Sequence, residues 1–233
     1  MGTMLVRTLI SQASKYLNDQ TNRHWSQPTL LDWLNYGESA ICMMKPDAYS
    51  DTESVRLVPG TLQTIPANGI MPGRLLKNTG IDGATPGRVI TEMHINVMDT
   101  DPDWHTTTAD TSIKHYVRIP GSNNKYYVWP PVHASTAVYV EIVYPASPQS
   151  IVVSDWVSGA QTINLPDIYL NPLLQLMLFR ACDMLSHDIP GMAQKAASAL
   201  ALAVQMITGK EDAEKMTKIR SMSDGPQPIP REV

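Results

Sequence analysis

The carboxylates whose spacing most resembles that of a metal-binding loop lie in the segment DTDPDWH, residues 99–105. Its three aspartates match the alternating first positions of a calcium-binding loop, and Asp110 falls at the twelfth position. Such a loop needs glycine at its sixth position for a sharp turn, and Trp104 stands there instead. We therefore expect a solvated turn rather than a calcium site, and we expect no cofactor.

Nucleophilic and acid–base chemistry find little support elsewhere in the chain. There is no HExxH or GxSxG motif, and no histidine is spaced for metal binding with another histidine, cysteine or glutamate. Cys42 and Cys182 fall in helix-like segments, where cysteine usually acts as a small buried apolar residue, the alternative being a bridge between them. A cell-wall hydrolase would need two neighbouring carboxylates, and the spacing of Glu53, Glu92 and Glu141 does not bring two together. We expect a protein that is not an enzyme.

Aromatic residues are the remaining candidates for a binding site. The chain has nine Tyr and five Trp against one Phe, and the first two types suit half-exposed surfaces. A row of them on a sheet would stack on sugars or bases, or would fill the core and line a protein interface. We favour the second interpretation and assign a subunit or tail interface to Trp104, Tyr126, Tyr127 and Trp129.

Composition and charge restrict the class of protein. The chain has 233 residues, of which 43% are hydrophobic, and a formal net charge of −4 without a basic stripe. It has no apolar run of about 18 residues, so we expect no membrane span. A protein that grips nucleic acid through its phosphates usually carries a basic stripe, so tight DNA binding is not expected.

Apolar residues recur at helical spacing near both ends of the chain. The pattern predicts helices over residues 4–17, 26–44, 165–188 and 192–209. Each of these helices has an apolar face and no other partner, so we expect them to pack on one another. The expected bundle core consists of Leu9, Ile10, Leu30, Trp33, Leu34, Ile41, Leu174, Met177, Leu178, Ala197 and Leu200.

The middle of the chain is typical of strands. Runs rich in β-branched and aromatic residues, separated by Gly, Pro, Asn and Asp, predict six or seven antiparallel strands across residues 51–164. The first two runs flank Pro59 and Gly60, which predicts a β-hairpin. Pro72 and Gly73 interrupt the run IMPGRLLKN, so we expect an irregular sheet edge there.

These patterns together predict an α+β fold. A helical bundle is built from both ends of the chain, and an antiparallel β-sheet or sandwich domain is inserted into it. The expected divisions are an N-terminal helical hairpin (1–50), the β domain (51–164), a C-terminal helical hairpin (165–209) and a charged, Pro-rich arm (210–233). The arm has too little apolar surface to fold alone.

Several motifs follow one another in a specific order from residue 5 to about residue 208. They are WSQPTLLDWLNYGESAICMMKPDAY, VRLVPGTLQTIPANG, GATPGRVI, PDWHTTTA, KYYVWPP followed by VYVEIVYPASP, and LPDIYLNPLLQLMLFRACDML. Each motif is weak alone, whereas their joint order resembles the head-to-tail adaptor proteins of tailed bacteriophages, the tail tubular protein A-like group of connector or neck proteins.

The resemblance implies a structural virion protein without enzymatic activity or cofactor. Such adaptors form a homo-oligomeric ring, usually of twelve copies, between the portal protein and the tail nozzle or tube. DNA passes through the lumen of the ring during packaging and ejection. The resemblance also implies synthesis in the bacterial host cytoplasm, a final location in the neck of the virion, and no contact with a membrane.

The C-terminal arm is the expected portal contact, because an extended Pro-rich segment loses little further entropy on docking. Two other functions stay open, namely another neck or tail component, such as a tail-completion or stopper protein, and a carbohydrate-binding tail module. The residues assigned to portal binding are Gly225, Pro226, Pro228, Ile229, Pro230 and Arg231.

Overall fold

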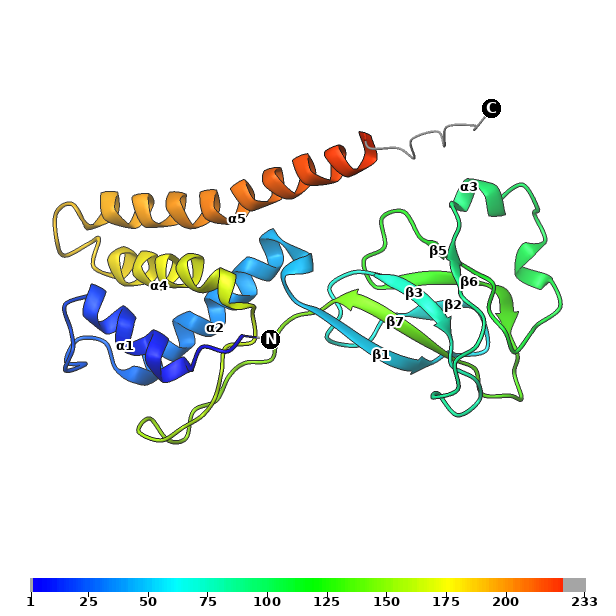
Figure 1. Cartoon of the computed structure of the whole chain (residues 1–233), viewed down its shortest axis with the longest axis horizontal. Coiled ribbons are helices and arrows are strands. Elements are labelled where there is room, and N and C mark those ends of the chain that lie inside the picture. Colours follow the sequence, from blue (N-terminus) through cyan, green and yellow to red (C-terminus); the bar gives the residue numbers. More distant parts are fainter. Residues whose placement is uncertain (1, 224–233) are drawn as a thin grey trace, which may run out of the picture. The chain divides into compact units, whose positions relative to one another are not determined.

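The structure, a computed structural model, describes the backbone of residues 2–223 and the side chains of residues 2–209. The arm residues assigned to portal binding lie outside this part. The fold is α+β, with helices from both ends of the chain and strands from its middle (Figure 1). The chain divides into a helical unit, Met1–Lys45 with Ser150–Val233, and a β unit, Pro46–Gln149.

Four helices of more than one turn make up the helical unit. Helix α1 contacts both α2 and α4, whereas α5 packs mainly against α4. Their bounds are α1 (Val6–Tyr16), α2 (Gln27–Met44), α4 (Leu170–Met184) and α5 (Met192–Ser223), and a short 3₁₀ turn, η3 (Asp167–Tyr169), precedes α4.

The second helix begins and ends where its sequence signals lie. The Ser26 side chain caps α2 by accepting a hydrogen bond from the backbone N–H of Thr29 at 3.3 Å, and Pro28 occupies the first turn. Lys45 leaves the helical region, with φ −137° and ψ 87°, because the proline that follows disfavours helical geometry in the residue before it.

Helices α2 and α4 approach closely at Gly37. A Cβ atom at this position would lie 3.2 Å from Cδ2 of Leu173, so a larger residue would push the helices apart. Most of the expected core residues are indeed buried in this unit, namely Leu9, Ile10, Leu30, Trp33, Leu34, Ile41, Leu174 and Met177.

On α5 and at the edge of α4, the residues predicted for the core are not the ones that the structure buries. Leu178 is half-buried, and Ala197 and Leu200 are exposed. The buried side of α5 instead carries Ala196 and Ala203. Alanine occurs around most of this helix, so the pattern of apolar residues does not define which face is buried.

Residues 150–164 were expected in the β domain but belong to the helical unit. The backbone N–H of Val6 donates to the carbonyl of Gln161 at 2.9 Å, and the N–H of Ile163 donates to the carbonyl of Met4 at 3.1 Å. The start of α1 therefore satisfies backbone groups of this segment that a sheet would otherwise pair.

The β unit contains two sheets. Neighbouring strands are antiparallel except for β4 and β5, which are parallel. The three-stranded sheet has the order β1 (Ser50–Arg56), β7 (Tyr139–Pro145), β3 (Arg74–Asn78). The four-stranded sheet has the order β2 (Gly60–Thr64), β6 (Lys125–Val132), β5 (His115–Arg118), β4 (Thr91–Glu92). Short helical turns η1 (Pro46–Ala48), α3 (Ile95–Met98) and η2 (Trp104–Thr106) complete the unit.

The predicted hairpin around Pro59 and Gly60 is wrong, because β1 pairs with β7 and β2 pairs with β6. The side chain of Gln63 fixes the link between the two sheets. It accepts from the N–H of Val58 and donates to the carbonyl of the same residue, both at 2.8 Å. The Gln63 amide also donates to the carbonyl of Gly60 at 3.3 Å.

One core is shared by the two sheets, with members on β3, β5, β6 and β7. Close packing explains the interruption at Pro72 and Gly73. A Cβ atom on Gly73 would lie 1.8 Å from the carbonyl oxygen of Val143 on β7, so β3 begins only at Arg74. The largest fully buried side chains of this core are Leu75, Ile90, Ile113, Tyr116, Tyr126, Ile142 and Tyr144.

Candidate functional site

The aromatic residues of β6 divide between the two faces of the four-stranded sheet. Tyr126 lies in the shared core, whereas Tyr127 and Trp129 lie on the opposite face and are half-buried. Trp104 from η2 packs against that second face, with its ring edge-on to Tyr127 at a centroid distance of 5.2 Å and stacked on His105 at 3.4 Å. A small second core thus covers the outside of this sheet.

Two of the four residues assigned to an interface are therefore not on the surface. Tyr126 is fully buried because alternate residues of a strand face opposite sides, and Trp104 is only 3% exposed because it closes the second core. Trp129 stacks on His115 at 5.8 Å, and the ammonium of Lys114 lies 5.4 Å from its ring centroid. The aromatic rings thus pack mainly on the chain itself, which disfavours a stacking platform for sugars.

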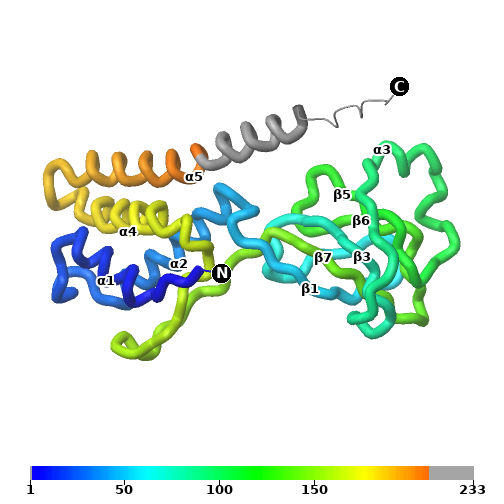
Figure 2. Tube along the Cα trace, in the orientation of Figure 1, coloured from blue at the N-terminus to red at the C-terminus, as the bar shows by residue number. Residues whose placement is uncertain are grey.

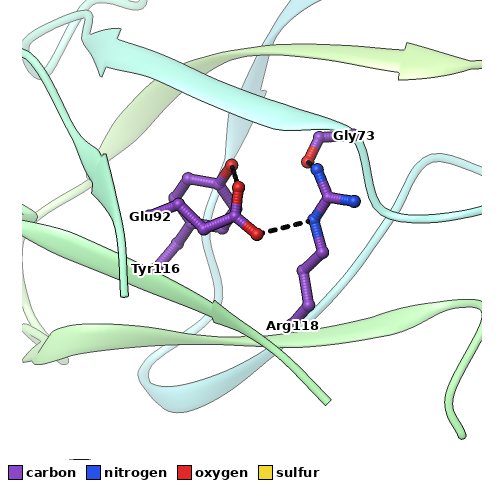
Figure 3. Close-up of polar contacts among 4 residues, drawn as sticks. All are labelled: Gly73, Glu92, Tyr116 and Arg118. Carbon is purple, nitrogen blue, oxygen red and sulfur yellow. Dashed lines mark hydrogen bonds and ion pairs between the residues drawn. The ribbon is translucent and has the colours of Figure 1, made fainter. Parts of the chain in front are cut away.

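A polar cluster links β5 to the segment before β3 (Figure 3). The Tyr116 hydroxyl donates to Oε2 of Glu92 at 2.9 Å, and Nε of Arg118 lies 3.0 Å from its Oε1. The Arg118 guanidinium also donates to the carbonyl of Gly73 at 3.2 Å. Burial, with the hydrogen bond to Glu92, raises the pKa of Tyr116 to about 12. Since both oxygens of the carboxylate are engaged, the cluster is a cross-link rather than an acid–base pair.

The aspartates that resemble a calcium loop do not gather around one point. Asp101 accepts from the N–H of Asp103 at 3.2 Å, whereas Asp110 accepts from the N–H of Thr111 at 2.7 Å and of Ser112 at 3.3 Å. Across residues 2–209, no group of three or more His, Cys, Asp or Glu side chains has the geometry to hold a metal ion.

Glu38 is a buried carboxylate that sequence reasoning missed. It lies on α2, is 1% exposed, and accepts from the side chain of Asn164 at 2.7 Å and from backbone N–H groups before α4. A signal was present, because Glu38 is four residues after Leu34 and so lies on the apolar stripe of the helix. Asn35 adds a second link, since its side chain pairs with both the N–H and the carbonyl of Ile151.

Helix α5 exposes several apolar side chains between Met192 and Gly209. Between Met192 and Gly209 the only charged residue is Lys195. The exposed apolar residues lie on two flanks of the helix, Ala193, Ala197, Leu200 and Ala201 on one and Leu202 and Met206 on the other, and Gln194, Ser198 and Gln205 lie between them. We call the six apolar residues the α5 surface. Exposed apolar side chains gathered on one helix are candidates for an interaction site.

Cys42 and Cys182 are both free thiols and form no disulfide bridge.

Among the helices of the described residues, none combines the length and the apolar character needed to cross a bilayer.

The fold is thus α+β, with a helical unit and a β unit. A family model described as SU10 adaptor protein matches residues 4–224, nearly the whole chain. The chain belongs to the SU10 adaptor protein family, which is of the phage head–tail adaptor type. A search of the curated proteins finds no match to this chain.

Proposed function

We propose that this protein forms the ring that joins the portal to the tail nozzle or tube in the neck of a tailed bacteriophage. In this role its copies, usually twelve, surround the channel through which DNA enters and leaves the head. Membership of the adaptor family supports the class of protein. The α5 surface is the observation that carries the proposal for a ring.

The argument from the α5 surface is energetic. Burial of apolar area contributes about 25 cal/mol per Å², so the exposed Ala, Leu and Met side chains of α5 favour association. Within residues 192–209 most side chains of α5 are exposed, so they are available to a partner. A contact between unlike faces of identical subunits closes into a ring when the rotation between them is suitable.

The charge of the chain agrees with a channel through which DNA slides. Tight binding to DNA comes largely from neutralised phosphates, and its free energy grows with the number of Lys and Arg contacts. A chain with a net charge of −4 and scattered basic residues provides few such contacts. DNA would then pass as a non-specific polymer.

The experiment is assembly with the cognate portal ring, followed by electron microscopy of the particles. We expect a stacked second ring on the portal for the wild-type chain. Met206→Glu on the α5 surface should abolish this ring, whereas Val58→Glu, at an exposed apolar position of the β unit, should leave it intact. Failure of the wild-type chain to bind portal in any form would refute the proposed function.

The arm at residues 225–231 remains our proposed portal contact. Alternating prolines in a sequence favour an extended conformation, which would lower the entropy lost on docking. Ending the chain at Asp224 should weaken binding to portal while ring formation in isolation is kept. Normal portal binding by this shortened chain would remove the arm from the account.

A further inference from the structure

Three basic side chains gather beside the second core of the β unit. His115, the first residue of β5, is paired with Trp129 of β6, and their rings stack with a centroid distance of 5.8 Å. Figure 2 shows β5 and β6 side by side. The ammonium of Lys114 lies 5.4 Å from the centroid of the same tryptophan ring, and the charge of the exposed Arg88 also acts on His115. We call Arg88, Lys114 and His115 the basic cluster.

Hydrogen bonds hold the backbone that carries the basic cluster. The side chain of Asn78 donates to the carbonyl of Arg88 at 2.9 Å. The carbonyl of Lys114 accepts from the N–H of Thr91 at 3.1 Å, and the Thr91 hydroxyl lies 2.6 Å from Nδ1 of His115. Because these segments are already fixed, a ligand would have to order only the ends of the side chains.

Neighbouring carboxylates do not neutralise the basic cluster. Within the part of the chain that the structure describes, neither Arg88 nor Lys114 forms an ion pair with a carboxylate. Glu92 follows the residue that pairs with His115, but its two oxygens are engaged by Tyr116 and Arg118 (Figure 3). Alternate residues of a strand face opposite sides, so this carboxylate lies on the other face of the sheet.

The imidazole of His115 reports the sign of the local field. Burial lowers the pKa of His115, and the charges of Arg88 and Lys114 lower it further. A carboxylate near the ring would act in the opposite direction. Among the described residues, no carboxylate offsets the two cations at this position. The electrostatic potential at this ring is therefore positive, which favours an anion.

A shallow depression beside the basic cluster offers space for a ligand. Its volume is about 410 Å³, and its lining includes Thr108, Asp110, Lys114 and Trp129. Asp110 is the only carboxylate among the described residues that line it, and its Oδ1 accepts from two backbone N–H groups at 2.7 and 3.3 Å. The two cations of the basic cluster outnumber this single carboxylate. The depression thus has a positive rim and a hydroxyl donor.

We propose that the basic cluster binds a phosphate group, the group that the backbone of DNA presents in series. A guanidinium, an ammonium and an imidazole together offer donors for three or more oxygens, whereas a carboxylate ligand has only two. With DNA as the source of the phosphate, the inference rests on the proposed channel and names its contact with the polymer. One such site in each copy gives a weak, salt-sensitive contact, which is compatible with DNA that slides.

The test is a pH titration of the histidine side chains by NMR in the full chain, in which His115→Gln identifies the His115 signal. Inorganic phosphate is compared with sodium chloride at equal ionic strength. A bound phosphate adds negative charge beside the ring, so it should raise the pKa of His115 by about 0.5 or more. The other five histidines should respond clearly less. An unchanged His115, or an equal rise in acetate, would overturn the proposal.

Variants of the two cations show whether the response belongs to this site. Arg88→Gln and Lys114→Met each remove one charge and should weaken phosphate binding at least tenfold. Lys125→Met is the matched control, because it removes the same charge at an exposed position of β6 and should bind phosphate as the wild type does. Melting temperatures confirm that each variant is folded. Equal losses in Lys125→Met and Lys114→Met would show that only the net charge matters, and would overturn the site.

Two polymers distinguish the source of the phosphate. A short DNA duplex should shift the His115 signal, with an affinity that falls as salt rises. A response to inorganic phosphate without one to the duplex would keep the phosphate site and assign it to a small ligand. An equal response to polyglutamate would point to an acidic protein segment and overturn the proposal.

The outcomes for this site and for the proposed ring are separable. A chain that builds a ring on portal but shows no response to phosphate would lose this inference alone. A chain that binds phosphate through the basic cluster but never assembles on portal would refute the proposed function, and the phosphate site would stand.

Discussion

The carboxylate of Glu38 in α2 accepts a hydrogen bond from the backbone N–H of Asn164 at 2.8 Å, although 126 residues separate them in the chain. The entire β unit lies between these two residues. A single buried carboxylate therefore ties the first half of the helical unit to the segment that starts its second half. We expect this link to couple the unfolding of α2 to that of the segment before α4.

Replacing Glu38 tests how much this link stabilises the helical unit. Glu38→Ala leaves buried N–H groups without an acceptor, which we expect to cost about 2–3 kcal/mol in the free energy of unfolding. Glu38→Gln keeps an acceptor oxygen and should cost clearly less. Chemical denaturation followed by helical circular dichroism measures both, and equal losses for the two variants would contradict the role given to the hydrogen bonds.

The same residue predicts how stability depends on pH. Burial raises the pKa of Glu38 above its ordinary value of 4.5. Its contribution is therefore fully present below the ordinary pKa and is lost as pH rises through the raised one. Wild type should lose stability relative to Glu38→Gln in that window, and parallel stability curves for the two proteins would show that the carboxylate does not titrate as described.

Two buried tyrosines of the β core provide a matched pair. The Tyr126 hydroxyl has no hydrogen-bond partner within the described residues, whereas the Tyr144 hydroxyl donates to Glu53 at 2.7 Å and lies 2.9 Å from Oδ1 of Asn68. We expect Tyr126→Phe to be neutral or stabilising, and Tyr144→Phe to cost about 1–2 kcal/mol in the free energy of unfolding. Thermal unfolding distinguishes the two variants. A larger loss of stability for Tyr126→Phe than for Tyr144→Phe would contradict the finding that only the Tyr144 hydroxyl is hydrogen-bonded.

Two glycines of the same unit separate close packing from backbone conformation. At Gly73 a Cβ atom would overlap the backbone of β7, so Gly73→Ala should cost about 3 kcal/mol or more. At Gly121, φ is +78° and no atom lies within 4 Å of the added carbon, so Gly121→Ala should cost only about 1 kcal/mol of strain. Denaturant melts report the difference, and a tolerated Gly73→Ala would show that β3 and β7 are further apart.

The two thiols should react very differently. Burial, reinforced by the nearby charge of Glu38, raises the pKa of Cys42 to about 11, so at neutral pH it is a protonated, enclosed thiol. Cys182 is only half-buried. A thiol reagent should modify Cys182 in the native protein and Cys42 only after unfolding. Rapid modification of both residues without denaturant would contradict the burial of Cys42.

The fold class could be predicted because its determinants are local. Apolar residues such as Leu30, Leu34 and Ile41 recur at helical spacing, and Pro46 marks the end of α2. Strand pairing is a long-range property, so the turn at Gly60 could not reveal that its flanking strands join different sheets. Residues 150–164 were misplaced for the same reason, because their partners lie at the start of α1 and on α2.

The interaction surfaces were harder to predict than the fold. Alternation along β6 contained the information that Tyr126 and Tyr127 face opposite sides, but not which side is the core. Trp104 was assigned to an interface because nothing local shows that its loop folds back over the sheet. The high exposure of Val157 became visible only in the structure, since valine in the sequence gives no sign of being at the surface.

The most direct test of the account is the native mass of the wild-type chain, measured alone and together with its portal ring. The account expects the 25.7 kDa chain to form one discrete closed oligomer, of about twelve copies, at least when portal is present. A chain that remains a monomer under both conditions would contradict the claim that copies of this chain build a ring.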